Sequence, residues 1–430
     1  MKTKTIFAFV AAAIASALAV PAKAQSTDIT LNFFHAYPST AAFLQPVVKD
    51  FMRDNPGIAI NLQVPAEDYA KAHQTIMRDV LTNNLPDIYL PAYSWLRPLV
   101  KTLEERGLAV NLQPFMDKET AGWTKENYAE SVLNLGQVEG KQFAVPFNAS
   151  TPILYVNADL VTKAGGSMDK FPDEWQGVID LANRIKASSS DVAGLNFSVG
   201  ALASDWYWQL MVLSQGGRIV NADEAGIGFD NETGLKALQL AQDISLKTGM
   251  TVDTSTDPAH QQFFAGKLGM VVASPSGVAN FTKAVGGRFD MRTVRYPMPD
   301  RNKGGLPTGG NAVVILAQEP AKQDAAWKFV KYLTSAKVQA QIAQTTGYMP
   351  TNRNSAALLT EFYAANPNFR TVFTQMDNAA TWYAYPNNMG STVWKAQAEI
   401  LDQLQRGALT PKDALARMAE RVAAILKKGS

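Results

Sequence analysis

The first part of the chain alternates short apolar runs with longer segments whose apolar residues recur at helical spacing. Residues 28–35, 58–64 and 87–90 read as buried strands, and residues 40–55 and 67–82 between them read as amphipathic helices. Strands and helices that alternate at these lengths predict right-handed crossovers and a parallel sheet covered on both faces. In such sheets ligands bind beyond the carboxyl ends of the strands. The segments expected at that edge are 35–38, 65–69 and 91–95.

An extended apolar stretch over residues 143–157 (FAVPFNASTPILYVN) predicts a segment that crosses from one lobe to another. Pro146 and Pro152 lack the amide N–H that a central strand donates, so a corner is expected between two apolar runs. One bent strand inside a single domain is the alternative for this stretch alone. Residues 269–281 (GMVVASPSGVANF) again run from an apolar strand into a Ser/Pro/Gly corner. Two such crossings favour two lobes with a cleft between them.

The rest of the pattern indicates the same fold class. Helices are predicted over 174–187, 234–247, 325–334, 391–405 and 410–426, strands near 289–296 and over 312–317, and a glycine-rich turn over 303–311. Thr410 precedes Pro411, which is the expected order of an N-cap and a first helical residue. We therefore expect an α/β fold with two lobes, a hinge of crossing strands and a helical C-terminal tail. Residues 25–145 plus 277–333 would form the N-terminal lobe, and residues 146–276 plus 334–430 the C-terminal lobe.

The start of the chain has the features of a secretory signal peptide. Residues 1–24 combine a basic beginning, an apolar run over 6–20 and a small-x-small sequence that ends at Ala24. An apolar run of roughly 15 residues is shorter than the about 20 that a membrane-spanning helix needs. We expect cleavage after Ala24 and export to the periplasm. Gln25 would then be the first residue, and it offers no thiol for a lipid anchor.

Charge and cysteine content exclude several classes of function. The formal charge falls from +2 to −1 when the three lysines of the leader are removed. The mature chain therefore lacks the basic surface that nucleic acid or an anionic membrane would require. The chain has no cysteine, so disulfides and thiolate metal sites are excluded. We expect a monomer that binds no nucleic acid.

Motifs of catalysis and cofactor binding are missing from the sequence. His35, His73 and His260 stand far apart without the carboxylate spacing of a metal site. There is no G-x-S-x-G nucleophile elbow, phosphate loop or dinucleotide-binding turn. We expect no catalytic residue, no metal and no cofactor. A secreted glycoside hydrolase stays as an alternative, because its two acids leave no recognisable sequence spacing.

Two aromatic clusters suggest what kind of ligand the cleft holds. One is Trp206-Tyr207-Trp208 and the other lies within residues 381–388 (TWYAYPNN). Consecutive helical residues point in different directions, so at least one ring of the first cluster should face a cleft, a partner or solvent. Packing of all three rings in the core is the alternative. Aromatic faces pack against the C–H faces of sugar rings, which favours a sugar or polyol over an apolar ligand. Gly309-Gly310 indicates a close backbone approach or a tight turn.

Five stretches of the chain together carry a family resemblance: FNASTPILYVNAD (147–159), ASPSGVANF (273–281), TGGNAVVI (308–315), TGYMPT (346–351) and GALTPKDALARMAERV (407–422). Over nearly its full length the chain resembles the periplasmic extracellular solute-binding proteins of carbohydrate-type ABC importers, most closely the glycerol-3-phosphate-binding branch. The resemblance implies two α/β lobes that close on a ligand about a hinge. It also implies delivery of the ligand to permease subunits in the inner membrane.

The resemblance also implies which residues contact the ligand. Two departures from the branch stand out: Tyr93 occupies the place of its cleft glutamate, and Tyr385 the place of the arginine that meets phosphate. Loss of a guanidinium removes the best partner for a dianion. We therefore expect a neutral sugar, oligosaccharide or glycoside ahead of glycerol-3-phosphate or a glycerophosphodiester. The full expected set is Tyr37, Tyr69, Tyr93, Ser150, Trp206, Tyr207, Trp208, Ser274, Ser276, Gly309, Gly310, Tyr348, Trp382 and Tyr385.

Overall fold

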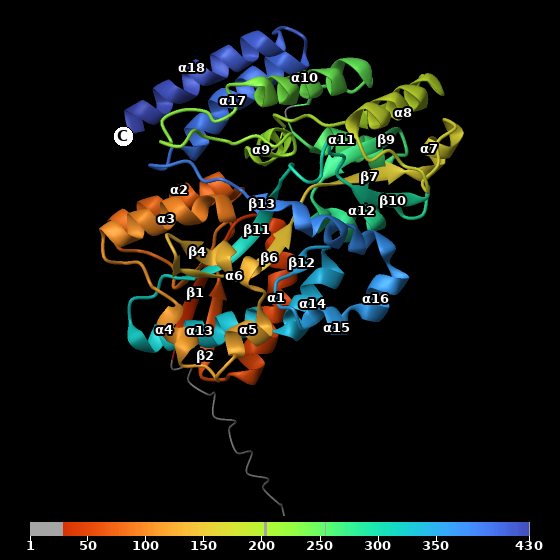
Figure 1. Ribbon diagram of the computed structural model, residues 1–430. Coiled ribbons are helices and arrows are strands. Elements are labelled where there is room, and N and C mark those ends of the chain that lie inside the picture. The colour runs from red at the N-terminus through yellow and green to blue at the C-terminus, as the bar shows by residue number, and fades with distance from the viewer. Residues whose placement is uncertain (1–28, 202–203, 254, 430) are drawn as a thin grey trace, which may run out of the picture.

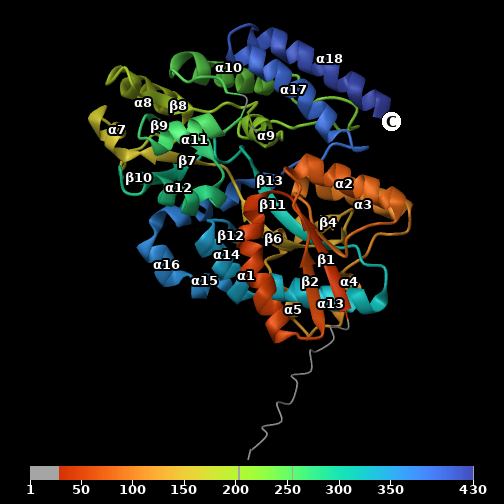
Figure 2. The ribbon, with the colours of Figure 1, turned by 180° about the vertical axis from the view of Figure 1, so that it is seen from behind.

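A computed structural model describes residues 29–201, 204–253 and 255–429, and shows two α/β lobes (Figure 1). Each lobe is built on its own sheet, one of seven strands and one of four. The same arrangement is seen from behind in Figure 2, with helices on the outer faces of both lobes. The predicted leader and its cleavage site at Ala24 lie outside the described residues. Within the described ranges, none of the helices is both long and apolar enough to cross a membrane.

The first lobe begins with the predicted alternation of strands and helices. Strands β1 (Ile29–His35), β2 (Ile58–Leu62) and β3 (Ile88–Leu90) are parallel, as expected. Helices α1 (Pro38–Asp54) and α2 (Tyr69–Thr82) connect them. Residues 91–95 leave the carboxyl end of β3 as expected, and α3 (Tyr93–Glu105) begins within them.

The larger sheet is covered on both faces because its strands are apolar on both faces. Leu31 and Phe33 of β1 share a core with α1 and with α13 (Pro320–Leu333). Phe34, the next residue along the strand, packs in a second core with α2 and α3. Successive side chains of a strand point to opposite faces, which explains why adjacent residues enter different cores.

The predicted crossing at residues 143–157 is confirmed. Strand β6 (Ala144–Ser150) lies in the seven-stranded sheet, and β7 (Ile153–Asn157) lies in the four-stranded one. Thr151 and Pro152 are the two residues between them. The corner between two apolar runs is therefore where the chain passes from one lobe to the other.

The second crossing was expected at residues 269–281, and this prediction is wrong. Strands β9 (Leu268–Ala273) and β10 (Met291–Arg295) both pair with β7, so the chain stays in the second lobe until Arg295. The corner after β9 leads instead into α12 (Val278–Val285), whose Phe281 ring stacks on Tyr155 of β7. An apolar strand followed by a corner thus fits a strand–helix unit within one lobe. The chain returns to the larger sheet between residues 296 and 305.

The exact limits of the lobes stay a prediction, but the pairing and packing add two facts to it. Strand β10 lies inside the range 277–333 expected for the N-terminal lobe, yet it belongs to the four-stranded sheet. Helix α14 (Ala336–Thr345) lies beyond that range, yet its Val338 and Ile342 share the core of β1, α1 and α13.

The glycine-rich turn expected over residues 303–311 is largely strand. Strand β11 (Leu306–Ile315) contains both Gly309 and Gly310 and pairs with β6 and β3. The alternative of a close backbone approach is the correct one. A Cβ atom on Gly309 would lie 2.9 Å from the Trp206 ring. Gly310 has φ +117°, a backbone conformation that favours glycine, next to a shift of register at Asn311.

The second lobe is completed by helices on both faces of its sheet and by the predicted helical tail. Thr410 caps the last helix as expected, because its Oγ1 accepts from the backbone N–H of Asp413 at 3.1 Å. Helices α17, α18 and α10 lie together at the top of Figure 1. Besides β7, β9, β10 and α12, the elements of the second lobe are α7 (Ala158–Lys163), α8 (Trp175–Ala187), β8 (Ala193–Asn196), α9 (Trp206–Leu213), α10 (Glu232–Lys247), α11 (Asp257–Phe264), α17 (Gly390–Gln405) and α18 (Pro411–Gly429).

Short elements fill the remaining connections. They are α4 (Gln113–Asp117), α5 (Trp123–Asn127), α6 (Glu130–Leu133), β4 (Gln137–Val138), β5 (Lys141–Gln142), β12 (Met349–Pro350), α15 (Ser355–Leu358), α16 (Thr360–Ala365) and β13 (Ala379–Thr381), with 3-10 segments η1 (Asn134–Gly136), η2 (Pro275–Gly277) and η3 (Pro367–Asn378).

One buried glutamine joins two of the passages between the lobes, the one after β6 and the one after β10. Gln375 in η3 donates through Nε2 to Thr151 Oγ1 at 2.8 Å and to the carbonyl of Pro152 at 2.7 Å. Its Oε1 accepts from the backbone N–H of Tyr296 at 2.9 Å. Three polar groups of the hinge therefore share one partner, whose side chain is 1% exposed.

Candidate functional site

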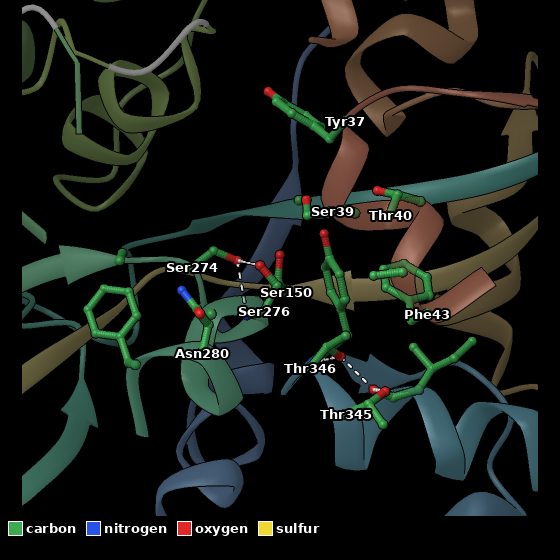
Figure 3. A pocket seen from close by; sticks show the side chains of 18 of the residues that line it. Tyr37, Ser39, Thr40, Phe43, Ser150, Ser274, Ser276, Asn280, Thr345 and Thr346 are labelled. Atoms are coloured by element: carbon green, nitrogen blue, oxygen red, sulfur yellow. Dashed lines mark hydrogen bonds between the residues drawn. The ribbon is translucent and has the colours of Figure 1, made fainter. Parts of the chain in front are cut away.

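A cavity of about 580 Å³ lies where the two lobes meet (Figure 3). The first lobe contributes residues of α1, α2 and α14, and the second lobe contributes residues of α9, α11 and α12. The ends of β6 and β11 form the part between them. Most of the predicted contact residues line this cavity, namely Tyr37, Tyr69, Ser150, Trp206, Tyr207, Ser274, Ser276, Gly309, Gly310, Tyr348 and Trp382.

The pairing of β6 with β11 brings Ser150 and Gly309 opposite one another. Trp206 at the start of α9 packs against Gly309, which has no side chain to push the ring away. The indole Nε1 donates to the carbonyl of Pro307 at 2.9 Å, which fixes the orientation of the ring. The small residues Ser150 and Gly309 and the Trp206 ring therefore depend on each other for their positions.

Three tyrosines line the first-lobe side of the cavity. The rings of Tyr37 and Tyr69 meet edge to face with centroids 4.9 Å apart. The Tyr69 hydroxyl donates to Asn311 Oδ1 at 3.2 Å. Burial raises the pKa values of Tyr37, Tyr69 and Tyr348 above that of a free tyrosine, so all three hydroxyls keep their protons at neutral pH. As neutral phenols they can exchange hydrogen bonds with a ligand, Tyr69 as an acceptor because its proton goes to Asn311.

The backbone at Tyr37 is unusual for a residue with a side chain. Its φ is +61° and its ψ is 125°, and it precedes the first turn of α1. Its backbone N–H donates to the carbonyl of Ala66 at 2.8 Å, which ties the loop after β1 to the loop after β2. Such positive φ values cost of order 1–3 kcal/mol and persist where surrounding contacts hold them.

Two serines line the second-lobe side. The backbone N–H and the hydroxyl of Ser276 both donate to Ser274 Oγ, at 3.2 and 2.9 Å. Figure 3 shows both side chains near Ser150, at the centre of the view. Three hydroxyl groups from two lobes thus gather at one place, as recognition of a hydroxylated ligand would require.

Trp382 comes from the loop after β13 and is held by a buried acid. Its Nε1 donates to Asp205 Oδ1 at 2.9 Å, and Gln209 Nε2 donates to Asp205 Oδ2 at 2.7 Å. Gln209 in turn accepts from the backbone N–H of Tyr383 at 2.9 Å. Asp205 and Gln209 thereby fasten the aromatic loop to α9, and the Trp206 and Trp382 rings lie 6.1 Å apart.

Three of the predicted residues do not line this cavity. Trp208 is fully buried and its ring packs on Phe229, so one member of the aromatic triplet is core while its two neighbours face the cavity. Tyr93 donates its hydroxyl to the carbonyl of Asn148 at 2.9 Å. Tyr385 lines a separate, smaller cavity.

Several lining residues were not predicted, although they lie in segments that the sequence singles out, because the packing of the lobes decides which side chains of a segment face the cavity. Phe43 on α1 and Thr346 after α14 line the first-lobe side, and Asn280 on α12 lines the second-lobe side. His260 on α11 was weighed as a metal ligand, not as a cavity residue. Its Nε2 is buried and has no hydrogen-bond partner among the described residues. Burial lowers the pKa of His260, so its ring is neutral at pH 7 and offers one donor and one acceptor.

The cavity lining is uncharged. No Asp, Glu, Lys or Arg is among its residues in the described part of the chain. Nor do three His, Cys, Asp or Glu side chains lie close enough to share a metal ion within the described ranges. What the lining offers is neutral hydroxyl, amide and backbone groups beside aromatic rings.

Comparison with known proteins agrees with this arrangement. Residues 47–371 match the family of bacterial extracellular solute-binding proteins. The sn-glycerol-3-phosphate-binding periplasmic protein UgpB of Escherichia coli K12 is 22% identical over 98% of this chain and 97% of its own length.

Two solved structures cover most of both chains. UgpB from Mycobacterium tuberculosis, in complex with glycerophosphocholine, has a TM-score of 0.79 at 21% identity and covers 93% of this chain and 98% of its own. The GacH receptor of Streptomyces glaucescens, solved unliganded and with acarbose, has a TM-score of 0.77 at 20% identity, covering 93% of this chain and 99% of its own. These likenesses confirm the predicted two-lobed fold.

Proposed function

Because the chain belongs to the bacterial extracellular solute-binding proteins, we propose that it captures a neutral sugar, oligosaccharide or glycoside between its lobes and delivers it to a membrane permease. The observation that carries this proposal is the uncharged lining of a cavity rich in hydroxyl groups and aromatic rings. An anion buried there would lose its hydration without gaining a Lys or Arg partner. A neutral hydroxylated ligand exchanges water for Ser, Asn and Tyr groups at little cost.

The volume and the walls of the cavity also support a sugar-sized ligand. About 580 Å³ falls within the range of small-molecule sites. Trp206 and Trp382 offer ring surfaces, while Ser150 and Ser276 offer hydroxyls. Because the two lobes both contribute, a ligand that contacts both would favour the closed arrangement over the open one.

We propose that the protein acts in the periplasm, as a monomer, and leaves its ligand chemically unchanged. The relatives described above are named as binding proteins or receptors, which supports a binding role. A glycoside hydrolase needs two carboxyl groups roughly 5 to 9.5 Å apart across the scissile bond. The described lining provides no such pair, so hydrolysis is the less favoured function.

Glycerol-3-phosphate or a glycerophosphodiester is the second candidate ligand. The similarity to UgpB favours it, and so does the position of α12, whose first turn follows Ser276 and Gly277 at the cavity wall. A helix N-terminus attracts anions through its free backbone N–H groups. The missing basic side chain argues the other way, and a ligand panel separates the two.

A thermal-shift panel on the mature chain from Gln25 tests the proposal. It should contain neutral mono- and disaccharides, glycosides, sugar acids, glycerol-3-phosphate and glycerophosphodiesters. A ligand at about 100 times its Kd stabilises the folded state by about 2.7 kcal/mol, a shift of a few degrees in Tm. We expect a neutral sugar or glycoside to give the shift and to be recovered unchanged. Stabilisation by glycerol-3-phosphate alone would overturn the choice of ligand, and product formation would overturn the binding role.

A further inference from the structure

A second cavity, of about 180 Å³, lies between α2 and α3 of the first lobe and α17 of the second. Gln74, Ser94 and Ser391 line it with polar groups from these three helices. Ser204 lines both this cavity and the larger one, so the two are neighbours. Asp205, which holds Trp382 of the larger cavity, also lines this second one.

Aromatic side chains and one acid dominate the smaller cavity. Trp95, Tyr383, Tyr385 and Trp394 line it together with Asp205. The rings of Tyr383 and Tyr385 stand perpendicular to each other with centroids 5.4 Å apart. Aromatic rings around a space beside a carboxylate are the combination that binds quaternary ammonium ions, through ring quadrupoles and charge.

Asp205 has no opposite charge in the described part of the chain. It is 7% exposed, and its two hydrogen-bond donors, Trp382 Nε1 and Gln209 Nε2, are both neutral groups. The ion pairs of the described residues do not include it. A buried carboxylate without a cation is costly in free energy, and a bound cation would remove that cost.

Two charged groups that contact Tyr383 of this cavity are already paired with each other. Arg97 makes an ion pair with Glu224 at 2.7 Å, and the Tyr383 hydroxyl donates to the same carboxylate at 2.8 Å. Burial lowers the pKa of His73, whose ring stacks on Trp95, to about 4, so this histidine is neutral at pH 7. Neither the arginine nor the histidine supplies a positive charge to Asp205.

We propose that the smaller cavity binds an organic ammonium group, which lies among the four aromatic side chains and faces the Asp205 carboxylate. This site is distinct from the proposed sugar site, and choline is the simplest probe for it. Since Ser204 borders both cavities, a hydroxylated solute that carries an ammonium group would reach both. The chemical class is thus a quaternary or tertiary amine, free or attached to a polyol or sugar.

The site should lose its ligand in acid. Burial raises the pKa of Asp205 to about 6, so a proton competes with the cation below that pH. The other titratable groups around the cavity do not change charge in this range. Burial raises the pKa values of Tyr383 and Tyr385, that of His73 is about 4, and Arg97 lowers the pKa of Glu224. Choline affinity should therefore fall about tenfold per pH unit below about pH 6.

Calorimetry and thermal shift of the mature chain test the proposal with matched probes. Choline chloride and tetramethylammonium chloride are compared with 3,3-dimethylbutan-1-ol, the neutral isostere of choline, and with potassium chloride at equal ionic strength. We expect choline to raise Tm and to bind at least tenfold more tightly than the isostere. Equal binding of the isostere, or no effect of choline beyond that of potassium chloride, would overturn the proposal.

Variants assign the effect to the cavity. Asp205→Asn should weaken choline binding at least tenfold, and Trp394→Leu should weaken it without touching the acid. Asp253→Asn, which changes an acid outside both cavities, is the matched control and should bind choline as the unmodified chain does. If Asp205→Asn fails to fold, the choline affinity of Trp394→Leu, which changes a half-buried residue of α17, still tests whether choline binds in this cavity. Unchanged choline affinity in Trp394→Leu would overturn the site.

The outcome is separable from that of the sugar proposal. Neutral sugars that bind while choline does not would leave the proposed function intact and remove the ammonium site. If choline binds and no neutral sugar does, the ammonium site stands and the proposed sugar ligand is removed.

Discussion

Arg97 and Glu224 form a two-point ion pair from one lobe to the other. The guanidinium Nη1 lies 2.7 Å from Oε1 and Nη2 lies 3.1 Å from Oε2 of the carboxylate. Arg97 belongs to α3 of the first lobe, and Glu224 to the loop between α9 and α10 of the second. Glu224 has φ +57°, which is uncommon for a residue with a side chain, so its loop adopts a costly conformation where it meets Arg97.

This ion pair should favour the closed arrangement of the lobes and hence ligand binding. Both side chains are about one-third exposed, so the ion pair stabilises the closed arrangement by about 1 kcal/mol or less. We expect Glu224→Gln to raise the Kd of the cavity ligand by up to about fivefold, and the effect to shrink at high salt. Titration calorimetry at two salt concentrations measures it. Asp402→Asn breaks the pair with Arg406 at the C-terminal end of α17 and should leave the Kd unchanged. An equal effect of both changes would contradict the interpretation.

The close approach at Gly309 should be required for binding more than for folding. A Cβ atom there would lie 2.9 Å from the Trp206 ring and 3.0 Å from Ser150 Oγ. Gly309→Ala should therefore displace the ring, weakening ligand binding about tenfold or more while Tm falls by a few degrees at most. Gly200→Ala, where the nearest atom would be 3.5 Å away, is the control. Unchanged affinity in Gly309→Ala would show that this ring position is not needed.

Asp205 should make the chain more stable in mild acid. Its pKa is raised by burial from 3.8 to about 6, so the folded state takes up a proton at a pH where the unfolded state does not. Stability from this group rises as pH falls from about 7 to about 4, by up to roughly 3 kcal/mol. Urea unfolding across this range should show the rise relative to Asp205→Asn. Parallel pH profiles of the two proteins would contradict the raised pKa.

Gln375 should couple stability to closure of the lobes. Gln375→Leu leaves the Pro152 carbonyl and the Tyr296 N–H without their partner, at about 1–3 kcal/mol for each buried group. We expect lower stability and altered ligand affinity together. Gln339→Leu is the matched control, because Gln339 bonds the Thr351 N–H and the Leu333 carbonyl away from the two passages. Gln339→Leu should lower stability and leave the ligand Kd unchanged. A changed Kd in both variants would argue against a hinge role for Gln375.

The apolar pattern determined many of the elements and one of the passages between the lobes, while the second predicted crossing was wrong. Residues 143–157 predicted the passage between sheets because two prolines interrupt two apolar runs. The triplet at 206–208 predicted that its rings face different surroundings, as they do. Such features are local, since the periods of helix and strand fix which side of an element is apolar.

The tertiary structure decided how those elements pair and which side chains meet. The sequence does not show that β10 pairs with β7, that His260 lines the large cavity, or that Asp205 lies among four aromatic rings of a second one. Arg97 and Glu224 are 127 positions apart. Contacts over such distances depend on strand order and helix packing across the whole chain, and no local periodicity records them.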